Sequence, residues 1–562
     1  MKTTENSIPV STSLTGFYRK ARARRKMPVD RRVFYLSVQV ILNAVLIGII
    51  AKVLVYLIDG ITNLAFYGRL SLEPAGPAGN HLGGAVVLIP ILGAVVVGLM
   101  ARFGSKAIGG HGIPEAMEKI ILDESRIPPA ITFLKPLSAA ISIGTGGPFG
   151  AEGPIIATGG AFGSLTGQWM HISPGERKIV LAAGACAGMA AIFGSPLAAV
   201  LLAVELLLFE FSPRSVIPVG LACVTGAGMH FLLFGTRPVF GMSAIPVPDD
   251  TALAIYVLLG ALVGVVAALV SKSVYWIEDM FDRLPVHWMW WPAIGAIAIG
   301  VVGYFAPHTM GVGYDNIQWL LKGAAPLGAL ATLGVLKYVS WSISLGSGTS
   351  GGTLAPLFTI GGALGAVLGG IVVQLFPLTH INIATAALIG MAAMFAGASR
   401  AWLTSIVFAL ETTGQINGLL PLLGACLAAY FVSFFLMKGN IMTEKIHRRG
   451  VRTPDAYEPD ALRAVTVREL LTPADAAVAG LPTCRASDDA GLAAEMMGQY
   501  NTDSIAVKDE DEEGKIIGVV TSRSILQYYS NQRQKEQDYQ SPARTRRILV
   551  QGRRILRTYK NQ

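Results

Sequence analysis

Long apolar runs, separated by short polar segments, follow one another along the chain as far as residue 437. Each run has about 18 residues or more, which is enough for a helix to cross the hydrocarbon core of a bilayer. The runs cover residues 33–58, 83–102, 216–235, 252–272, 289–306, 325–346, 354–377, 383–411 and 418–437. The pattern predicts an all-α polytopic membrane protein whose transmembrane domain occupies residues 32–447.

The composition agrees with this fold class. Of the 562 residues, 52% are hydrophobic and only 14% are charged, whereas soluble domains carry about 25% charged residues. The first run begins too late and is too long for a cleaved signal peptide, so we expect it to remain as a membrane helix. The cysteines have no spacing typical of a metal site or a disulfide framework. They are Cys186, Cys223, Cys426 and Cys484.

Basic residues gather at both ends of the apolar region. The segment RKARARRK (19–26) lies in a basic N-terminal stretch, 1–31, and EKIHRRGVR (444–452) follows the last run. The positive-inside rule therefore places both termini in the cytoplasm, with the protein in the inner or plasma membrane of the cell. The net charge of +9 fits contact with anionic lipid, and we expect no nucleic-acid partner.

The chain becomes polar after the last run. Residues 448–464 read as a linker, and residues 465–530 predict a small soluble α/β unit. In that unit, AVTVREL (464–470) indicates a strand that leads into a helix, AGLAAEMMGQY (490–500) an amphipathic helix, and DSIAVKDEDEEGKIIGVVT (503–521) two strands. Residues 531–562 are rich in Lys and Arg and predict a basic tail.

The apolar region repeats itself. PIIATGGAFG (154–163) has the Pro, Gly-Gly-Ala and Gly spacing of PLFTIGGALG (356–365), 202 positions later. LAAVLLAVE (197–205) matches LTSIVFALE (403–411), 206 positions later. Two related halves, at about 32–245 and 250–447, are therefore expected. Such halves are often inverted in transporters, with the substrate site between them near the middle of the membrane.

Three breaks rich in Gly and Pro interrupt the apolar runs: GGHGIPEA (109–116), GAEGPII (150–156) and SGGTLAP (350–356). In each, glycines precede a proline that suits the first turn of a helix. Each break therefore predicts a helix N-terminus, which carries partial positive charge and free N–H donors. Three such ends meeting between two halves would form an anion site made of neutral dipoles.

Glu152 is the one acidic residue in the second break. A charged side chain at the bilayer centre costs several kcal/mol, and a helix N-terminus offsets part of that cost. We therefore interpret the Glu152 carboxylate as a tethered anion that occupies the site and leaves it when protonated. It would act as a gate that competes with the permeant ion and responds to pH.

The three breaks together resemble motifs of the CLC family of chloride channels and proton/chloride antiporters. GHGIPEA is similar to the family segment GSGIP, GAEGP to GREGP, and GGTLAP to GxFxP. The resemblance implies an all-helical fold with two inverted halves, and a homodimer with one pore per subunit. It also implies chloride binding at Gly112–Ile113 and Thr353–Leu354, gating by Glu152, and a lysine, Lys135, that raises the potential near the pore.

Several positions depart from the family pattern. His111 stands where the family has a serine that contacts the central anion, so anion preference and pH response are open. Met442 stands in place of a pore tyrosine. Leu206 replaces the internal proton-transfer glutamate of the antiporters, although Glu205 beside it could serve as a proton entrance. The family's channels also lack that glutamate, so Leu206 favours a passive chloride channel, with a proton-coupled antiporter as the alternative.

The soluble unit resembles a single CBS repeat. VTVRELLTP (465–473) and GKIIGVVTSRSIL (514–526) are similar to the opening and closing segments of that family. Ser524 replaces the aspartate that contacts nucleotide ribose, so binding of an adenine nucleotide stays open. The resemblance implies pairing with a second repeat across a dimer. No other cofactor and no metal is expected.

Two other classes of function fit parts of the sequence less well. GTSGG (348–352) contains a serine, Ser350, in a spacing used by serine hydrolases, but no histidine shares a recognisable motif with it. A metal-ion transporter regulated by a CBS unit would need oxygen ligands within the spans. The candidate carboxylates Glu152, Glu205, Glu210 and Glu411 are few and scattered. We therefore do not expect an enzyme.

Overall fold

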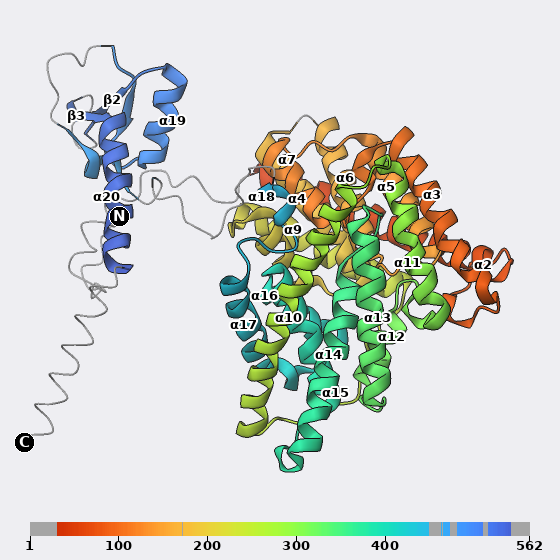
Figure 1. Cartoon of the computed structure of the whole chain (residues 1–562). Helices are drawn as coiled ribbons and strands as arrows, with labels where there is room; N and C mark the ends of the chain where they lie inside the picture. The colour runs from red at the N-terminus through yellow and green to blue at the C-terminus, as the bar shows by residue number, and fades with distance from the viewer. Residues whose placement is uncertain are drawn as a thin grey trace, which may run out of the picture. The chain divides into compact units, whose positions relative to one another are not determined.

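The computed structural model describes residues 31–170, 172–448, 462, 465–472, 480–509 and 515–540. The chain divides into a helical membrane unit and a small α/β unit, and each is described by itself. Figure 1 shows the helices of the membrane unit packed around one another and the strands of the second unit. The predicted segment 1–30, the tail from residue 541 and most of the linker lie outside the described residues.

The membrane unit contains two successive series of helices in the same order. The first series is α2 (Arg31–Tyr67), α3 (Leu88–Phe103), α4 (Ile113–Leu122), α5 (Pro129–Gly144), α6 (Glu152–Trp169), α7 (Pro174–Phe193), α8 (Pro196–Leu202) and α9 (Pro213–Leu233). The second is α10 (Asp250–Asp282), α11 (Trp291–Phe305), α12 (Tyr314–Leu321), α13 (Leu327–Gly346), α14 (Leu354–Leu375), α15 (Ile383–Ser399), α16 (Trp402–Thr413) and α17 (Leu419–Leu436). A short helix, α18 (Glu444–Arg448), follows.

Short turns connect these helices. A π-helical segment, η4 (Ala203–Leu208), continues α8. The 3₁₀ turns are η1 (Pro77–Gly79), η2 (Gly83–Val87), η3 (Lys106–Ile108), η5 (Trp288–Trp290), η6 (Pro307–Thr309), η7 (Pro377–Thr379) and η8 (Ile416–Gly418).

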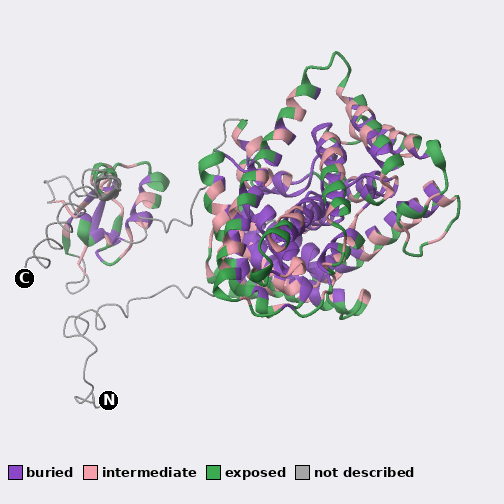
Figure 2. Cartoon of the chain, turned by 60° about the horizontal axis from the view of Figure 1, so that its bottom comes forward, coloured by how far each residue is buried: buried purple, intermediate pink, exposed green. Residues whose placement is uncertain are grey.

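The observed helices confirm the predicted membrane class, because eight of those described are long and apolar enough to cross a bilayer. The apolar run 383–411 was wrongly expected to be one span. It is two helices, because Arg400 adopts the left-handed conformation, with φ 61°. The Arg400 guanidinium also donates a hydrogen bond of 2.6 Å to the Met437 carbonyl. Figure 2 shows that buried residues concentrate in the middle of the membrane unit.

Closely packed glycines join the central helices in both halves. Helix α6 packs on α7, and α14 packs on α15. A Cβ atom on Gly184 would lie 2.3 Å from the Gly159 carbonyl oxygen, and one on Gly390 would lie 2.2 Å from the Gly361 carbonyl oxygen. Small residues of this kind let the backbones of membrane helices approach closely. The repeated glycine motif in the sequence is therefore a packing surface as well as a marker of the two halves.

We expect Gly184→Leu and Gly390→Leu to disrupt the fold, because each side chain would have to enter backbone of the neighbouring helix. Overpacking typically costs about 1–3 kcal/mol or more. The matched control is Gly228→Leu in α9, where no heavy atom lies within 4 Å of the added Cβ. Size-exclusion profiles and thermal unfolding in detergent measure the effect. Equal behaviour of all three variants would contradict this packing.

The α/β unit has a three-stranded sheet in the order β1-β2-β3. Its elements are η9 (Val467–Leu470), β1 (Thr483–Arg485), α19 (Ala490–Tyr500), β2 (Ser504–Lys508), β3 (Ile516–Thr521) and α20 (Ser522–Gln540). Strand β1 pairs parallel with β2, and β2 pairs antiparallel with β3. Burial raises the pKa of the Cys484 thiol on β1 to about 11, so this thiol is a protonated core group at neutral pH.

The middle of this unit was predicted correctly, and its start was not. The helix 490–500 and both strands within 503–521 are present. At the start, however, Thr466 makes only an isolated bridge to Asp489, and a single 3₁₀ turn follows it. At the end, α20 continues to Gln540, past residue 530 and into the segment that the sequence assigned to a basic tail.

Candidate functional site

The three breaks predicted from the sequence meet in space. The Gly110 N–H donates to the Thr349 carbonyl, and the Gly351 N–H donates to the Gly110 carbonyl, each at 3.3 Å. These bonds join the first break to the third. A Cβ atom on Gly112 would lie only 2.2 Å from the Gly153 carbonyl oxygen, so the first break also touches the second.

The second and third breaks pair through residues that correspond in the repeat. Gly150 and Gly352, which are 202 positions apart, form an antiparallel bridge. The Gly150 N–H donates to the Gly352 carbonyl at 3.3 Å, and the Gly352 N–H donates to the Gly150 carbonyl at 3.1 Å. Corresponding residues that pair while running in opposite directions lie on an approximate two-fold axis. The two halves are therefore inverted about this point, which is where transporters of this architecture bind substrate.

The Glu152 carboxylate lies at this junction and is only 1% exposed. Its Oε1 accepts a 2.9 Å hydrogen bond from the Ala355 N–H, in the first turn of α14 in the other half. Its Oε2 accepts a 3.4 Å hydrogen bond from the Tyr314 hydroxyl. The carboxylate thus occupies a helix N-terminus, where backbone donors and the helix dipole favour negative charge.

Glycines leave the space in which this carboxylate lies. A Cβ atom on Gly150 would stand 1.9 Å from Oε2 of Glu152, and one on Gly352 would stand 2.7 Å from Oε1. Both positions must therefore lack a side chain if Glu152 is to reach α14. Thr353, the N-cap of α14, and Leu354, its first residue, are buried at this junction, and chloride binding by them stays a prediction.

The sequence analysis missed Tyr314, the first residue of α12. Its N-cap, Gly313, has φ 78°, and Gly112, the N-cap of α4, has φ 96°. GVGYDN (311–316) follows GHGIPE (110–115) by 201 positions. The repeat therefore carried the signal for this fourth helix N-terminus, but the segment lacks the proline that marked the others.

In the first break, a side chain already occupies one of the predicted anion donors. The Gly112 N–H donates a 2.6 Å hydrogen bond to Oε2 of Glu115, within the same helix turn. An anion at this break would use the Ile113 N–H or displace Glu115. His111 is buried, and its Nδ1 has no hydrogen-bond partner among the residues that the structure describes. Glu115, Lys135 and Lys445 all interact electrostatically with the His111 ring.

Two buried lysines hold the segments that precede the α4 and α12 N-termini. The Lys135 ammonium donates to the carbonyls of Ile108 at 2.8 Å and Gly110 at 2.9 Å. Lys337, 202 positions later, donates to the carbonyls of Thr309 at 2.9 Å and Gly311 at 3.1 Å. Lys135 therefore holds backbone carbonyls in place in addition to supplying positive charge. Lys337 is its counterpart in the second half, and the sequence analysis did not identify it.

Glu205 and Glu411 form a reciprocal pair between the halves. Glu205 accepts hydrogen bonds from the N–H groups of Leu403 at 3.1 Å and Thr404 at 2.9 Å, and from the Thr404 hydroxyl at 2.6 Å. Glu411 accepts from the N–H groups of Leu197 at 3.0 Å and Ala198 at 2.9 Å. Each carboxylate therefore caps a helix of the opposite half. Helix capping alone accounts for the position of Glu205.

Met442 lies in a fixed turn before α18. Its N–H donates to the Asn440 side-chain oxygen at 2.8 Å, and the Tyr275 hydroxyl donates to the neighbouring Ile441 carbonyl at 2.7 Å. The Met442 side chain is fully buried, and α18 packs against α4. Helix α18, which begins two residues after Met442, therefore lies against the helix that follows His111.

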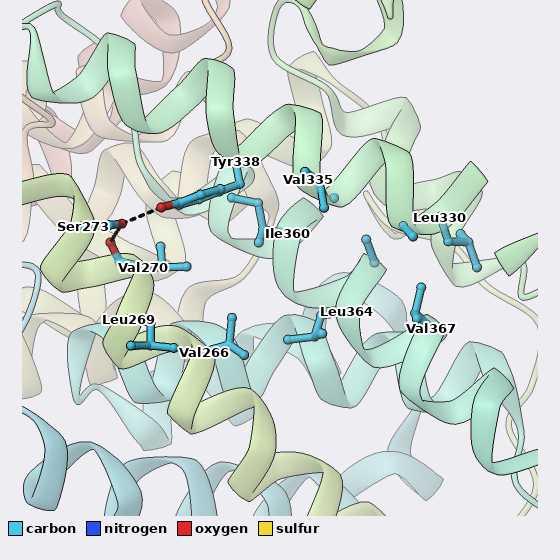
Figure 3. A pocket seen from close by; sticks show the side chains of 13 residues that line it. Val266, Leu269, Val270, Ser273, Leu330, Val335, Tyr338, Ile360, Leu364 and Val367 are labelled. Carbon is cyan, nitrogen blue, oxygen red and sulfur yellow. Dashed lines mark hydrogen bonds between the residues drawn. The ribbon is translucent and has the colours of Figure 1, made fainter. Parts of the chain in front are cut away.

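A cavity of about 500 Å³ lies between α10, α13 and α14 and is separate from this site. Its lining is apolar apart from Ser273 and Tyr338, whose hydroxyl donates to the Ser273 Oγ at 2.7 Å (Figure 3). None of the predicted site residues lines it. Ser350, the serine of the hydrolase-like spacing, is buried and its Oγ accepts from the Ser138 hydroxyl at 3.3 Å.

Two inverted halves that meet at helix N-termini around a buried carboxylate define an integral membrane transport protein with a site suited to anions. The chain belongs to the voltage gated chloride channel family, the CLC family, whose sequence profile matches residues 92–434. The CBS domain family matches residues 467–531. Both matches confirm the resemblances seen in the sequence motifs.

Relatives of the membrane unit are known from several bacteria. The H(+)/Cl(-) exchange transporter ClcA of Salmonella schwarzengrund is 28% identical over 472 residues, which cover 81% of this chain and 97% of that protein. The H(+)/Cl(-) exchange transporter ClcA of Yersinia pestis is 30% identical over 363 residues, which cover 63% of this chain and 75% of that protein. A slow cyanobacterial Cl⁻/H⁺ antiporter of known structure has a TM-score of 0.65 at 25% identity, and the match covers 73% of this chain and 97% of that one.

The fold also agrees with more distant structures. A CLC-type fluoride/proton antiporter has a TM-score of 0.56 at 22% identity, covering 70% of this chain and 95% of that one. At this identity the comparison supports the architecture alone. It confirms an all-helical CLC-like unit as the fold of the membrane part.

The cap role of Glu205 makes a specific prediction. Glu205→Gln and Glu411→Gln should both lower the free energy of unfolding, each by about 1–2 kcal/mol, because an amide replaces one acceptor oxygen with a donor. Thermal unfolding in detergent measures this. If only Glu205→Gln changed the ratio of protons to chloride moved by the protein, Glu205 would carry protons as well. If neither variant lost stability, the cap account would be wrong.

Proposed function

We propose that the protein exchanges chloride for protons across the cell membrane, with Glu152 as the gate of the anion path. The observation that carries the proposal is the Glu152 carboxylate on the N-terminus of α14, at the axis between the halves. This carboxylate is a tethered anion in a site of backbone donors. A free anion of similar charge would use the same donors.

Competition between carboxylate and chloride is the basis of the mechanism. While Glu152 is ionised, its oxygens hold the Ala355 N–H and the Tyr314 hydroxyl, and the path is closed. A proton on the carboxylate removes its charge and weakens both bonds, so the side chain leaves and chloride takes its place. The donors are neutral dipoles, which bind an anion without holding it too tightly to leave.

The comparisons favour exchange over the passive channel that the sequence favoured. Leu206 was the reason for that preference, since it stands in place of an internal proton-transfer glutamate. However, the relatives are exchange transporters by name, and the structure at 25% identity is an antiporter. The carboxylate of Glu205 is already bonded to three donors of α16. Glu152 is then the carboxylate best placed to carry the exchanged proton.

Three further features of the proposal come from the family resemblance, for the homodimer, and from the distribution of basic residues, for the membrane and the orientation. The protein acts as a homodimer with one pore per subunit, lies in the inner or plasma membrane, and has both termini in the cytoplasm. The basic segments at 19–26 and 444–452 support this orientation. Ser524 of the CBS unit accepts from the Thr521 N–H at 3.2 Å, and the Thr521 hydroxyl accepts from the Ser524 N–H at 3.1 Å, so the two residues form a reciprocal cap at the start of α20. Nucleotide binding is no part of the proposal.

The direct test is a reversal potential in liposomes under opposed chloride and proton gradients. We expect the wild-type value to lie away from the chloride equilibrium potential, because protons move with chloride. Glu152→Gln should follow chloride alone, conduct faster and lose most of its pH dependence, since no exchangeable carboxylate remains in the gate. A wild-type value at the chloride potential would show a channel. A folded Glu152→Gln protein with the wild-type pH profile would contradict the gating role.

His111 is proposed as a determinant of anion preference and pH response. Its ring is buried beside the first break, and its Nδ1 has no partner among the described residues, so it is available to an anion. An imidazole can donate a hydrogen bond while neutral and can also carry charge, so a change in its protonation would alter the binding of an anion beside it. We expect His111→Ser to change the ratio of chloride to nitrate flux and the pH dependence of flux. Unchanged values for both would show that His111 is only a packing residue.

A further inference from the structure

The hydroxyl of Tyr314 reaches the gate from the second half of the chain. Tyr314 begins α12, directly after Gly313, and its hydroxyl lies 3.4 Å from Oε2 of Glu152. The Ala355 N–H holds the other oxygen. Backbone N–H groups at the start of α14 and the Tyr314 phenol therefore both bond the carboxylate, and the phenol is the side-chain donor.

Aromatic packing fixes the position of this phenol. The Tyr314 ring centroid lies 5.7 Å from those of Phe193 and Phe240, and the Phe193 ring meets Phe408 edge-on at 4.8 Å. Aromatic pairs at such distances contribute to packing beyond the area they bury. The hydroxyl therefore stays at the gate whether or not the carboxylate is there.

The length of the bond is informative. A hydroxyl that donates to a carboxylate ordinarily lies about 2.5–2.7 Å from the oxygen, and here the separation is 3.4 Å. The phenol thus holds the carboxylate loosely. Chloride is larger than a carboxylate oxygen, so an anion in the vacated space would approach the hydroxyl without any movement of the aromatic cluster.

We propose that the Tyr314 hydroxyl is an anion ligand used in turn by Glu152 and by chloride. It bonds the carboxylate when the path is closed, and it bonds the permeant anion once the carboxylate has left. This inference rests on the proposed role of Glu152 as gate. The inference places a phenolic ligand between the N-termini of α12 and α14. The turn before α18 offers no phenol, because Met442 stands there in place of the family's tyrosine.

The charges around the gate do not replace this hydroxyl. Lys337 on α13 interacts electrostatically with Glu152, but its ammonium donates to the carbonyls of Thr309 and Gly311. The α14 element contributes its N-terminal backbone donors. Among the described residues, Tyr314 is therefore the side-chain donor to the carboxylate. Its hydroxyl can be removed by substitution while the backbone donors of α14 stay in place.

The first arm of the test uses chloride flux against pH for Tyr314→Phe. This variant keeps the ring among Phe193 and Phe240 and removes only the hydroxyl. Without that donor the carboxylate is held less firmly, so half-maximal flux should move toward neutral pH by about half a unit, as expected for one modest hydrogen bond. The control is Tyr338→Phe, whose hydroxyl bonds Ser273 in the separate cavity (Figure 3) and whose profile should match the wild type.

The second arm measures equilibrium chloride binding with the gate removed. In a Glu152→Ala background, Tyr314→Phe should weaken chloride binding about fivefold, and Tyr338→Phe should leave it unchanged. An unchanged pH profile or an unchanged chloride affinity for Tyr314→Phe would overturn the shared-ligand proposal. Failure of the gate itself appears separately, as a Glu152→Gln protein that keeps its pH dependence, so the two ideas fail by different results.

Discussion

A buried carboxylate bonded to the N-terminus of a helix from the other half of the chain is the constraint on which this structure depends. Glu152 could not remain charged inside a membrane without donors, and the first turn of α14 supplies one at 2.9 Å. The glycines of the second and third breaks follow from this contact, because Cβ atoms on Gly150 and Gly352 would collide with the carboxylate. The same donors make the site suitable for a free anion.

The inverted repeat explains why such a contact can exist. The axis passes through the Gly150–Gly352 pair, so helix N-termini of both halves point toward one region. Carboxylates then bond across the junction. Glu152 reaches α14, Glu205 caps α16 and Glu411 caps α8. The last two are reciprocal and stable caps, whereas Glu152 has no counterpart, because Leu354 occupies the corresponding position. Because of this asymmetry, the first half supplies the carboxylate that can move, and the second half supplies the donors that bind it.

Much of this arrangement could be predicted from residue patterns. Apolar runs gave the membrane class, and glycines before prolines marked three helix N-termini that the structure brings together. Tyr314 was missed because its helix begins without proline, and Lys337 was missed because it lies within an apolar run. The helix break at Arg400 has no glycine to signal its left-handed conformation. The Glu115 cap on Gly112 depends on a side-chain rotamer, which the sequence does not specify, so the predicted anion donor there was already bonded.

The central claim is that the Glu152 carboxylate and a permeant anion compete for the same donors. Bromide substitutes for chloride and gives an anomalous diffraction signal, so crystals of the wild type and of Glu152→Ala soaked in bromide test the claim directly. The account predicts a bromide peak within bonding distance of the Ala355 N–H and the Tyr314 hydroxyl in Glu152→Ala. It predicts no peak there in the wild type at neutral pH. A wild-type peak beside an undisplaced Glu152 carboxylate, or no peak in Glu152→Ala, would contradict it.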